Sequence, residues 1–189
     1  PAPSPPPRML PPDPQVQHFA GKGYMSEEQF SINTVPLSWV NGDHSFDVML
    51  SVPVRAAKYP LVIYLPGLGE PRTAGEGWRN AWAQAGYAVL SVQLLGADAD
   101  AWQSRAARNG DFKGVVRERY HPVAVAERQA ALMALFDTLK RRAVQGDETL
   151  KNVDLSRIAL AGYDLGAYAA MVGAGERYVN ERPVSALPV

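Results

Sequence analysis

The segment from Ile158 to Ala167 carries the pattern with the clearest chemical meaning in this chain. It reads Ile-Ala-Leu-Ala-Gly-Tyr-Asp-Leu-Gly-Ala, so Asp164 lies two residues from a glycine on either side. An apolar strand, a sharp turn and a small-residue helix would hold a reactive side chain in a strained turn. Gly162 and Gly166 fit this layout because small residues let the strand and the helix approach closely. The Leu165 amide would point into the site from a helix N-terminus, which favours negative charge.

Three short apolar runs are the elements that would position this turn. They are Leu61–Leu65, Tyr87–Val92 and Ile158–Ala161, and such runs are typical of strands buried on both faces of a parallel sheet. Two helical segments lie between them. The first contains Trp78 and Trp82, and the second runs from about Val123 to Ala143. The second has an apolar stripe at helical spacing, made of Leu132, Leu135, Phe136 and Leu139.

An antiparallel hairpin is predicted before these elements. Alternating apolar residues run from Phe30 to Trp39, with a slip in phase around Thr34–Pro36 that a bulge or an edge position would explain. Asn41–Gly42 supplies turn chemistry, and the alternation resumes from Phe46 to Val54. The order of elements predicts a three-layer α/β fold with a mostly parallel sheet that begins with this hairpin.

Composition excludes several classes of protein. The 189 residues are 47% apolar and 20% charged, which is ordinary globular composition. Nineteen basic residues balance nineteen acidic ones, so nothing favours nucleic-acid binding. The absence of cysteine excludes disulfides, thiolate metal sites and a cysteine nucleophile. No apolar run approaches the roughly 20 residues of a transmembrane helix. No histidine pair has the spacing of a helical metal site, and we expect no metal and no cofactor.

The N-terminal residues 1–17 are predicted to form a flexible, proline-rich arm. Eight of the sixteen prolines lie within the first fourteen residues, and such a stretch cannot build a hydrogen-bonded ladder. Residues 18–189 would then form the N-terminal portion of a single domain. Leaders of this kind often follow the signal sequence of exported bacterial proteins, which favours a periplasmic or secreted location. A chain without cysteine is equally compatible with the cytoplasm.

The stretch from residue 59 to residue 175 resembles α/β-hydrolases related to dienelactone hydrolases and platelet-activating-factor acetylhydrolases. Pro66–Gly69 corresponds to the His-Gly-Leu-Gly-like loop of that family, and Ala85–Val89 to its Ala-Gly-Tyr-Ala-Val strand. Val153–Gly166 corresponds to its Val-Asp-x-x-Arg-Ile-x-x-x-Gly-x-Ser-x-Gly motif. These elements follow one another in the family's order, and the resemblance implies the α/β-hydrolase fold.

The resemblance also implies a chemistry, which is carboxylic-ester hydrolysis through a covalent acyl intermediate on a small ester-like ligand. Asp164 stands at the position of the family's serine nucleophile, and the amides of Leu68 and Leu165 would be the oxyanion donors. Pro66 replaces the loop histidine, but a main-chain donor does not need that side chain. An aspartate that attacked an ester would form a labile anhydride rather than a stable acyl-enzyme.

In this family the catalytic acid and histidine follow the nucleophile along the chain. No histidine follows Asp164 here, and Glu176 and Glu181 lie too close to the turn to match the acid. The sequence stops at Ser185–Val189, about where the next core strand would begin. We therefore expect a second polypeptide, a C-terminal fragment of the same protein produced by proteolytic processing, to complete the domain.

Three interpretations of Asp164 are open. Haloalkane dehalogenases and epoxide hydrolases share this fold and use an aspartate nucleophile, although they usually have tryptophan where this chain has Leu165. The aspartate could also be an evolved or engineered replacement of serine in an esterase. In the third interpretation the chain is a non-catalytic binding protein, and the Asp164 carboxylate accepts hydrogen bonds from the Leu68 and Leu165 amides.

Two aromatic residues, Trp102 and Tyr163, are expected to line a substrate pocket. Trp102 lies on the long segment after Tyr87–Val92, at the carboxyl end of the sheet, where ligands of open α/β sheets bind. The acidic residues of that segment are expected to be solvated, as surface-loop residues usually are. They are Asp98, Asp100 and Asp111.

None of the three histidines is expected to be catalytic. His121 precedes Pro122, and this pair is typical of the start of a helix. His44 falls in the hairpin turn and His18 in the N-terminal arm, where both would be solvated.

Overall fold

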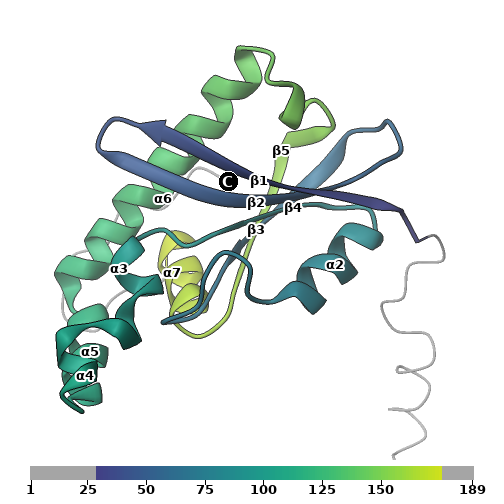
Figure 1. Ribbon diagram of the computed structural model, residues 1–189. Helices are drawn as coiled ribbons and strands as arrows, with labels where there is room; N and C mark the ends of the chain where they lie inside the picture. The colour runs from purple at the N-terminus through teal and green to yellow at the C-terminus, as the bar shows by residue number, and fades with distance from the viewer. Residues whose placement is uncertain (1–28, 176–189) are drawn as a thin grey trace, which may run out of the picture.

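A computed structural model describes residues 29–175 (Figure 1), and the predicted arm lies outside these residues. Within them, five strands form one mixed sheet in the spatial order β1-β2-β4-β3-β5. The strands β1 and β2 are antiparallel, as are β2 and β4, whereas β4, β3 and β5 run parallel. The strands are β1 (Ile32–Asn41), β2 (His44–Pro53), β3 (Tyr59–Leu65), β4 (Ala88–Val92) and β5 (Val153–Gly162).

The predicted hairpin is present, and of the two explanations offered for its phase slip the bulge is not observed. The register between β1 and β2 runs without interruption from Ile32 opposite Pro53 to Asn41 opposite His44. The phase slip around Thr34–Pro36 reflects the other possibility, an edge position, because β1 is the outermost strand of the sheet. An edge strand has one unpaired side, so the missing N–H of Pro36 costs no ladder hydrogen bond there.

Helices cover both faces of the sheet, which confirms the three-layer α/β fold. Helices α6 (Pro122–Val144) and α7 (Leu165–Gly173) pack on one face, where their side chains join the main core around Leu61, Ile63 and Leu90. Helix α2 (Glu76–Gln84) packs on the other face, as Figure 1 shows. No helix in residues 29–175 is both long enough and apolar enough to cross a membrane.

Helix α6 spans the helix predicted over residues 123–143. Leu132, Leu135 and Leu139 form its buried stripe and are at most 1% exposed. The helix begins after His121, whose Nδ1 accepts a hydrogen bond of 3.3 Å from the Val123 amide. Pro122 occupies the first helical position, where its missing N–H is not needed. The predicted helix-entry role of His121 is therefore confirmed.

The segment between β4 and α6 differs from the solvated loop that was predicted. It forms four short helices, which are α3 (Gly96–Ala99), η1 (Ala101–Gln103), α4 (Arg105–Arg108) and α5 (Phe112–Arg119). Asp100 and Asp111 are exposed as expected. The prediction for Asp98 is wrong, because this residue is fully buried. Its carboxylate pairs with the Arg128 guanidinium of α6 at 2.6 Å, and this partner makes burial of the charge tolerable.

Strand β5 starts earlier than its apolar run suggests. The short helix η2 (Glu148–Leu150) leads into it, and the pairing with β3 is irregular at Pro60/Leu61 before the regular register resumes at Ile158. In the described part of the chain β5 is the second edge strand, and Ile158 and Leu160 are only partly buried. The strand ends at Gly162, directly before the Asp164 turn.

The buried stripe of α6 provides a test of the core. Leu132→Ala should lower the free energy of unfolding by about 2–5 kcal/mol, because it removes buried methyl groups and leaves a cavity. Its neighbour Met133 is 40% exposed, and Met133→Ala should change stability by no more than about 0.5 kcal/mol. Urea denaturation of the two variants would measure the difference, and equal losses would contradict this packing.

Candidate active site

Asp164 occupies a strained turn between β5 and α7. Its backbone angles are φ 49° and ψ −117°, and it is the one described non-glycine residue with a positive φ. The turn is held by main-chain hydrogen bonds from the Tyr163 amide to the Leu65 carbonyl (3.1 Å) and from the Gly166 amide to the Tyr163 carbonyl (2.8 Å). Non-glycine residues persist in such conformations where the surrounding structure holds them, and these cluster at functional sites.

The two glycines of the turn are required by close backbone contact. A Cβ added at Gly166 would lie 1.9 Å from the carbonyl oxygen of Leu65, at the end of β3. A Cβ added at Gly162 would lie 2.3 Å from the carbonyl carbon of Gly166. Real Cβ atoms do not approach other atoms so closely, so the strand–turn–helix unit packs as tightly as the glycine spacing predicts.

Both carboxylate oxygens of Asp164 accept hydrogen bonds. The Leu68 amide donates to Oδ2 at 3.1 Å, and the Tyr120 hydroxyl donates to Oδ1 at 3.0 Å. The Asp164 side chain accepts no capping bond from the first amides of α7, so within residues 29–175 the Leu165 amide does not bind it. Only one of the two expected oxyanion donors therefore contacts the carboxylate.

Tyr120 is a protonated donor at neutral pH. Burial of its hydroxyl, together with the hydrogen bond to Asp164 and the charge of that carboxylate, raises the Tyr120 pKa to about 12. Its ring lies beside that of Tyr168 of α7, with 5.5 Å between the centroids. The Tyr120 hydroxyl therefore keeps its proton at neutral pH and donates a hydrogen bond to Oδ1.

The glycine-rich loop after β3 is fixed by hydrogen bonds on both sides. The Gly67 amide donates to Glu70 Oε2 at 2.8 Å, and Gln93 Nε2 donates to the carbonyls of Gly67 and Glu70 at 3.0 Å each. The Trp102 indole donates to the Leu68 carbonyl at 3.1 Å. Leu68 is thus held through its main-chain carbonyl, while its main-chain amide donates to Asp164.

The two aromatic residues expected to line a pocket lie beside this loop. Trp102 is 45% exposed and stacks edge-on against Phe112 of α5. Tyr163 is 61% exposed, and its ring would lie 3.1 Å from a Cβ placed on Gly67. Both side chains therefore border the surface around the exposed Asp164 carboxylate.

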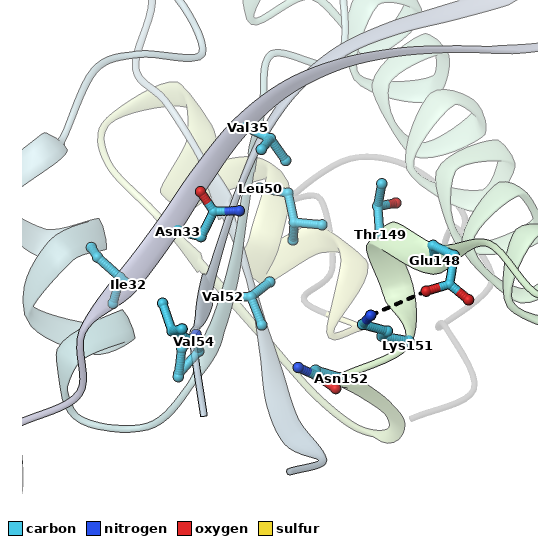
Figure 2. Close-up of a pocket in the computed structure, with 11 residues that line it drawn as sticks. Ile32, Asn33, Val35, Leu50, Val52, Val54, Glu148, Thr149, Lys151 and Asn152 are labelled. Atoms are coloured by element: carbon cyan, nitrogen blue, oxygen red, sulfur yellow. Dashed lines mark hydrogen bonds and ion pairs between the residues drawn. The ribbon is translucent and has the colours of Figure 1, made fainter. Parts of the chain in front are cut away.

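A groove in the described structure lies away from Asp164. Figure 2 shows this groove of about 560 Å³ between the β1–β2 hairpin and the η2 segment, with Val35, Leu50 and Val52 on one side and the Glu148–Lys151 ion pair on the other. It reaches Asn152, before β5, whereas Asp164 follows β5 at its far end. This groove is therefore separate from the strained turn and its converging donors.

The described histidines make no hydrogen bond to Asp164. His44 lies at the start of β2 with its ring stacked on Phe46, and His121 caps α6. His18 lies outside the described residues. Among residues 29–175 no three His, Asp or Glu side chains group as metal ligands.

Several residues of the site carry no signal in the sequence. Tyr120 lies 44 residues from Asp164, and Gln93 lies 26 residues from Gly67. Neither belongs to a motif, and only the folded chain brings them to the turn. Glu70 differs from these two residues, because it directly follows the glycine-rich loop in the sequence and its position there already indicates that it lies near the loop.

Comparison with known proteins identifies the fold of the chain. No protein-family model matches the chain, and no curated protein matches it. Among solved structures, it is similar to a dienelactone hydrolase from Anabaena variabilis, with a TM-score of 0.50 and 19% identity over 76% of this chain. It is also similar to a dienelactone hydrolase-like promiscuous phosphotriesterase from metagenomic libraries, with a TM-score of 0.50 and 17% identity over 75% of this chain.

The fold is an α/β-hydrolase fold. The chain spans 57% of the length of the first neighbour and 53% of the second. The Asp164 turn, between β5 and α7, has the strand–turn–helix geometry of an elbow.

The close contact at the elbow can be tested with two alanine substitutions. Gly166→Ala should cost about 1–3 kcal/mol or more of unfolding free energy, because its Cβ would overlap the Leu65 carbonyl. Gly77 of α2 has no atom within 4 Å of an added Cβ. Gly77→Ala should therefore be neutral or should stabilise by up to about 1 kcal/mol. Denaturation curves of both variants would decide, and a harmless Gly166→Ala would contradict the elbow geometry.

Proposed function

We propose that this chain carries the nucleophile elbow and oxyanion loop of a carboxylic-ester hydrolase in which aspartate has replaced the nucleophilic serine. The observation that carries the proposal is the hydrogen bond from the Leu68 amide to Asp164 Oδ2 at a strained elbow. An oxyanion donor acts on the oxygen that becomes negative in the transition state. In this protein, the side chain at the elbow supplies that negative oxygen itself.

The chemistry of the aspartate supports a nucleophile-altered esterase over an active one. If Asp164 attacked an ester through Oδ1, the product would be a labile anhydride rather than a stable acyl-enzyme. The Leu68 amide is already engaged by Oδ2, so it would not be available for the oxyanion of the substrate. The carboxylate therefore blocks the hole that ester hydrolysis requires, while the surrounding elbow and loop keep their geometry.

The remaining catalytic groups would come from further polypeptide. The described histidines have other roles, so a triad histidine and its acid must be supplied from outside residues 29–175. In the described residues one edge of β5 is unpaired, and that polypeptide could pack there. A groove of about 340 Å³, lined by Phe136, Leu160 and Met171, lies beside this strand. We propose that the completing segment is a C-terminal fragment of the same protein, held there after processing.

Replacing the aspartate tests the esterase proposal. In the longest natural form of the protein, Asp164→Ser should hydrolyse p-nitrophenyl acetate on the order of 10³-fold faster than Asp164→Ala, because a serine would leave the Leu68 amide free. A fluorophosphonate probe should label the substituted side chain in Asp164→Ser and leave Asp164→Ala unlabelled. Two equally inactive and unlabelled variants would rule out a latent esterase and favour a binding role.

A second candidate function is alkyl transfer to Asp164, and the different surroundings of its two oxygens favour it. Oδ1 would attack the carbon of an alkyl halide or epoxide, whose leaving group departs with the bonding electrons. Water would then attack the carboxyl carbon of the resulting ester. The ester oxygen that becomes negative in this second step is Oδ2, which the Leu68 amide already binds. The alcohol leaves, and the carboxylate is restored.

Isotope labelling separates this candidate from the first. A single turnover of an alkyl halide or epoxide in H₂¹⁸O should place one ¹⁸O atom in the peptide that contains Asp164, because water attacks the carboxyl carbon. Mass spectrometry of the digested wild-type protein would detect it, with Asp164→Asn as the control. Product formation without label in that peptide, or the absence of both product and an alkylated Asp164 peptide, would exclude aspartate as the nucleophile.

A further inference from the structure

A buried ion pair lies behind the site. The Arg128 guanidinium binds the Asp98 carboxylate through Nε–Oδ2 at 2.6 Å and Nη2–Oδ1 at 3.0 Å. Asp98 is fully buried and Arg128 is 2% exposed. Arg119 approaches the same carboxylate at 4.0 Å and is itself paired with Glu118. The proposed chemistry uses none of these charges. Burying a charged pair costs desolvation free energy, so its presence calls for an explanation.

One end of the pair is connected to the oxyanion loop. The Gly69 amide donates a hydrogen bond of 2.8 Å to the main-chain carbonyl of Asp98. Gly69 follows Leu68, whose amide binds Asp164 Oδ2. The position of the Asp98 backbone therefore fixes the loop one residue beyond the donor. Helix α3 has only four residues. The bidentate ion pair between its Asp98 side chain and Arg128 anchors this short helix to α6.

The other end of the pair is connected to the tyrosine. Arg128 Nη2 also donates to the main-chain carbonyl of Arg119, at the last residue of α5. The next residue is Tyr120, whose hydroxyl binds Asp164 Oδ1. One guanidinium thus holds the end of α5 and, through Asp98, the glycine-rich loop. These two segments supply both hydrogen bonds to the Asp164 carboxylate.

We propose that Asp98 and Arg128 are positioning residues, which set the Leu68 amide and the Tyr120 hydroxyl at hydrogen-bonding distance from the side chain at the elbow. The inference rests on the proposed function for its catalytic meaning, but its geometry can be tested without any substrate. A guanidinium is required because only its planar fork can bind both carboxylate oxygens and a carbonyl together. A lysine at position 128 would keep the charge and lose this geometry.

The titration of Tyr120 is the readout that separates positioning from mere stability. The groups that act on its hydroxyl are Asp164, Tyr168 and Arg128. Arg128→Lys keeps the cationic charge, so it changes the Tyr120 pKa chiefly by moving the hydroxyl away from Asp164. Nuclear magnetic resonance of ¹³Cζ-labelled tyrosine would follow this group in the 189-residue chain, with Tyr120→Phe to assign the signal.

In the wild-type chain the Tyr120 hydroxyl should stay protonated at pH values above the ordinary tyrosine pKa of 10.0, because burial and Asp164 raise the Tyr120 pKa to about 12. In Arg128→Lys that pKa should fall toward 10.0, and hydrogen exchange at the Leu68 amide should accelerate by at least about tenfold as its bond to Asp164 loosens. The matched control is Arg142→Lys, which alters the Arg142–Asp147 pair (2.6 Å) at the other end of α6. It should leave both readouts unchanged.

An Arg128→Lys variant that is less stable, yet keeps the wild-type Tyr120 titration and Leu68 exchange, would overturn the proposal. If Arg128→Lys does not fold, Asp98→Asn replaces it, because asparagine keeps the size and the main-chain carbonyl of Asp98. Failure of both variants to fold would assign the pair to the fold rather than to the site. Because no turnover is measured, these outcomes are independent of whether the Asp164→Ser variant gains esterase activity.

Discussion

The site depends on the contact between the first turn of α7 and the end of β3. The Gly166 backbone lies so close to the Leu65 carbonyl that no side chain fits between them. This contact brings the helix N-terminus against the end of β3, and Asp164, two residues before Gly166, adopts a positive φ. The same strand end leads directly into the glycine-rich loop. The elbow and the loop therefore share one support, and the Leu68–Asp164 hydrogen bond follows from it.

A carboxylate at this elbow changes what the site can do. Serine would place one hydroxyl at the turn and leave the loop amide free. Aspartate brings two oxygens and a negative charge, and the protein satisfies them with one main-chain amide and one protonated tyrosine. Within the described residues the Leu68 amide is thus engaged by the elbow side chain itself, whereas an esterase would use such an amide for the oxyanion of the transition state.

The parts of this fold that could be predicted from the sequence depend on local patterns. The glycines around Asp164 and the apolar stripe of α6 are such patterns. Each reflects packing against a neighbouring element, and the order of the elements along the chain already indicates which element that is. The parts that could not be predicted depend on single side chains that meet across long separations. Asp98 lies in a polar segment, and its burial follows only from Arg128, 30 residues later. Nothing near Tyr120 indicates that its hydroxyl reaches the elbow.

The elbow strand is also an edge strand in the described chain, which raises the question of how its geometry is maintained. Strand β5 is paired on one side only, with β3, and its apolar residues Ile158 and Leu160 are incompletely covered. Two contacts that hold the turn nevertheless come from the paired side. The Tyr163 amide binds the Leu65 carbonyl, and Gly166 packs on the same peptide group. Polypeptide packed on the free edge would add burial and catalytic groups, but the strained conformation of Asp164 is already determined by β3.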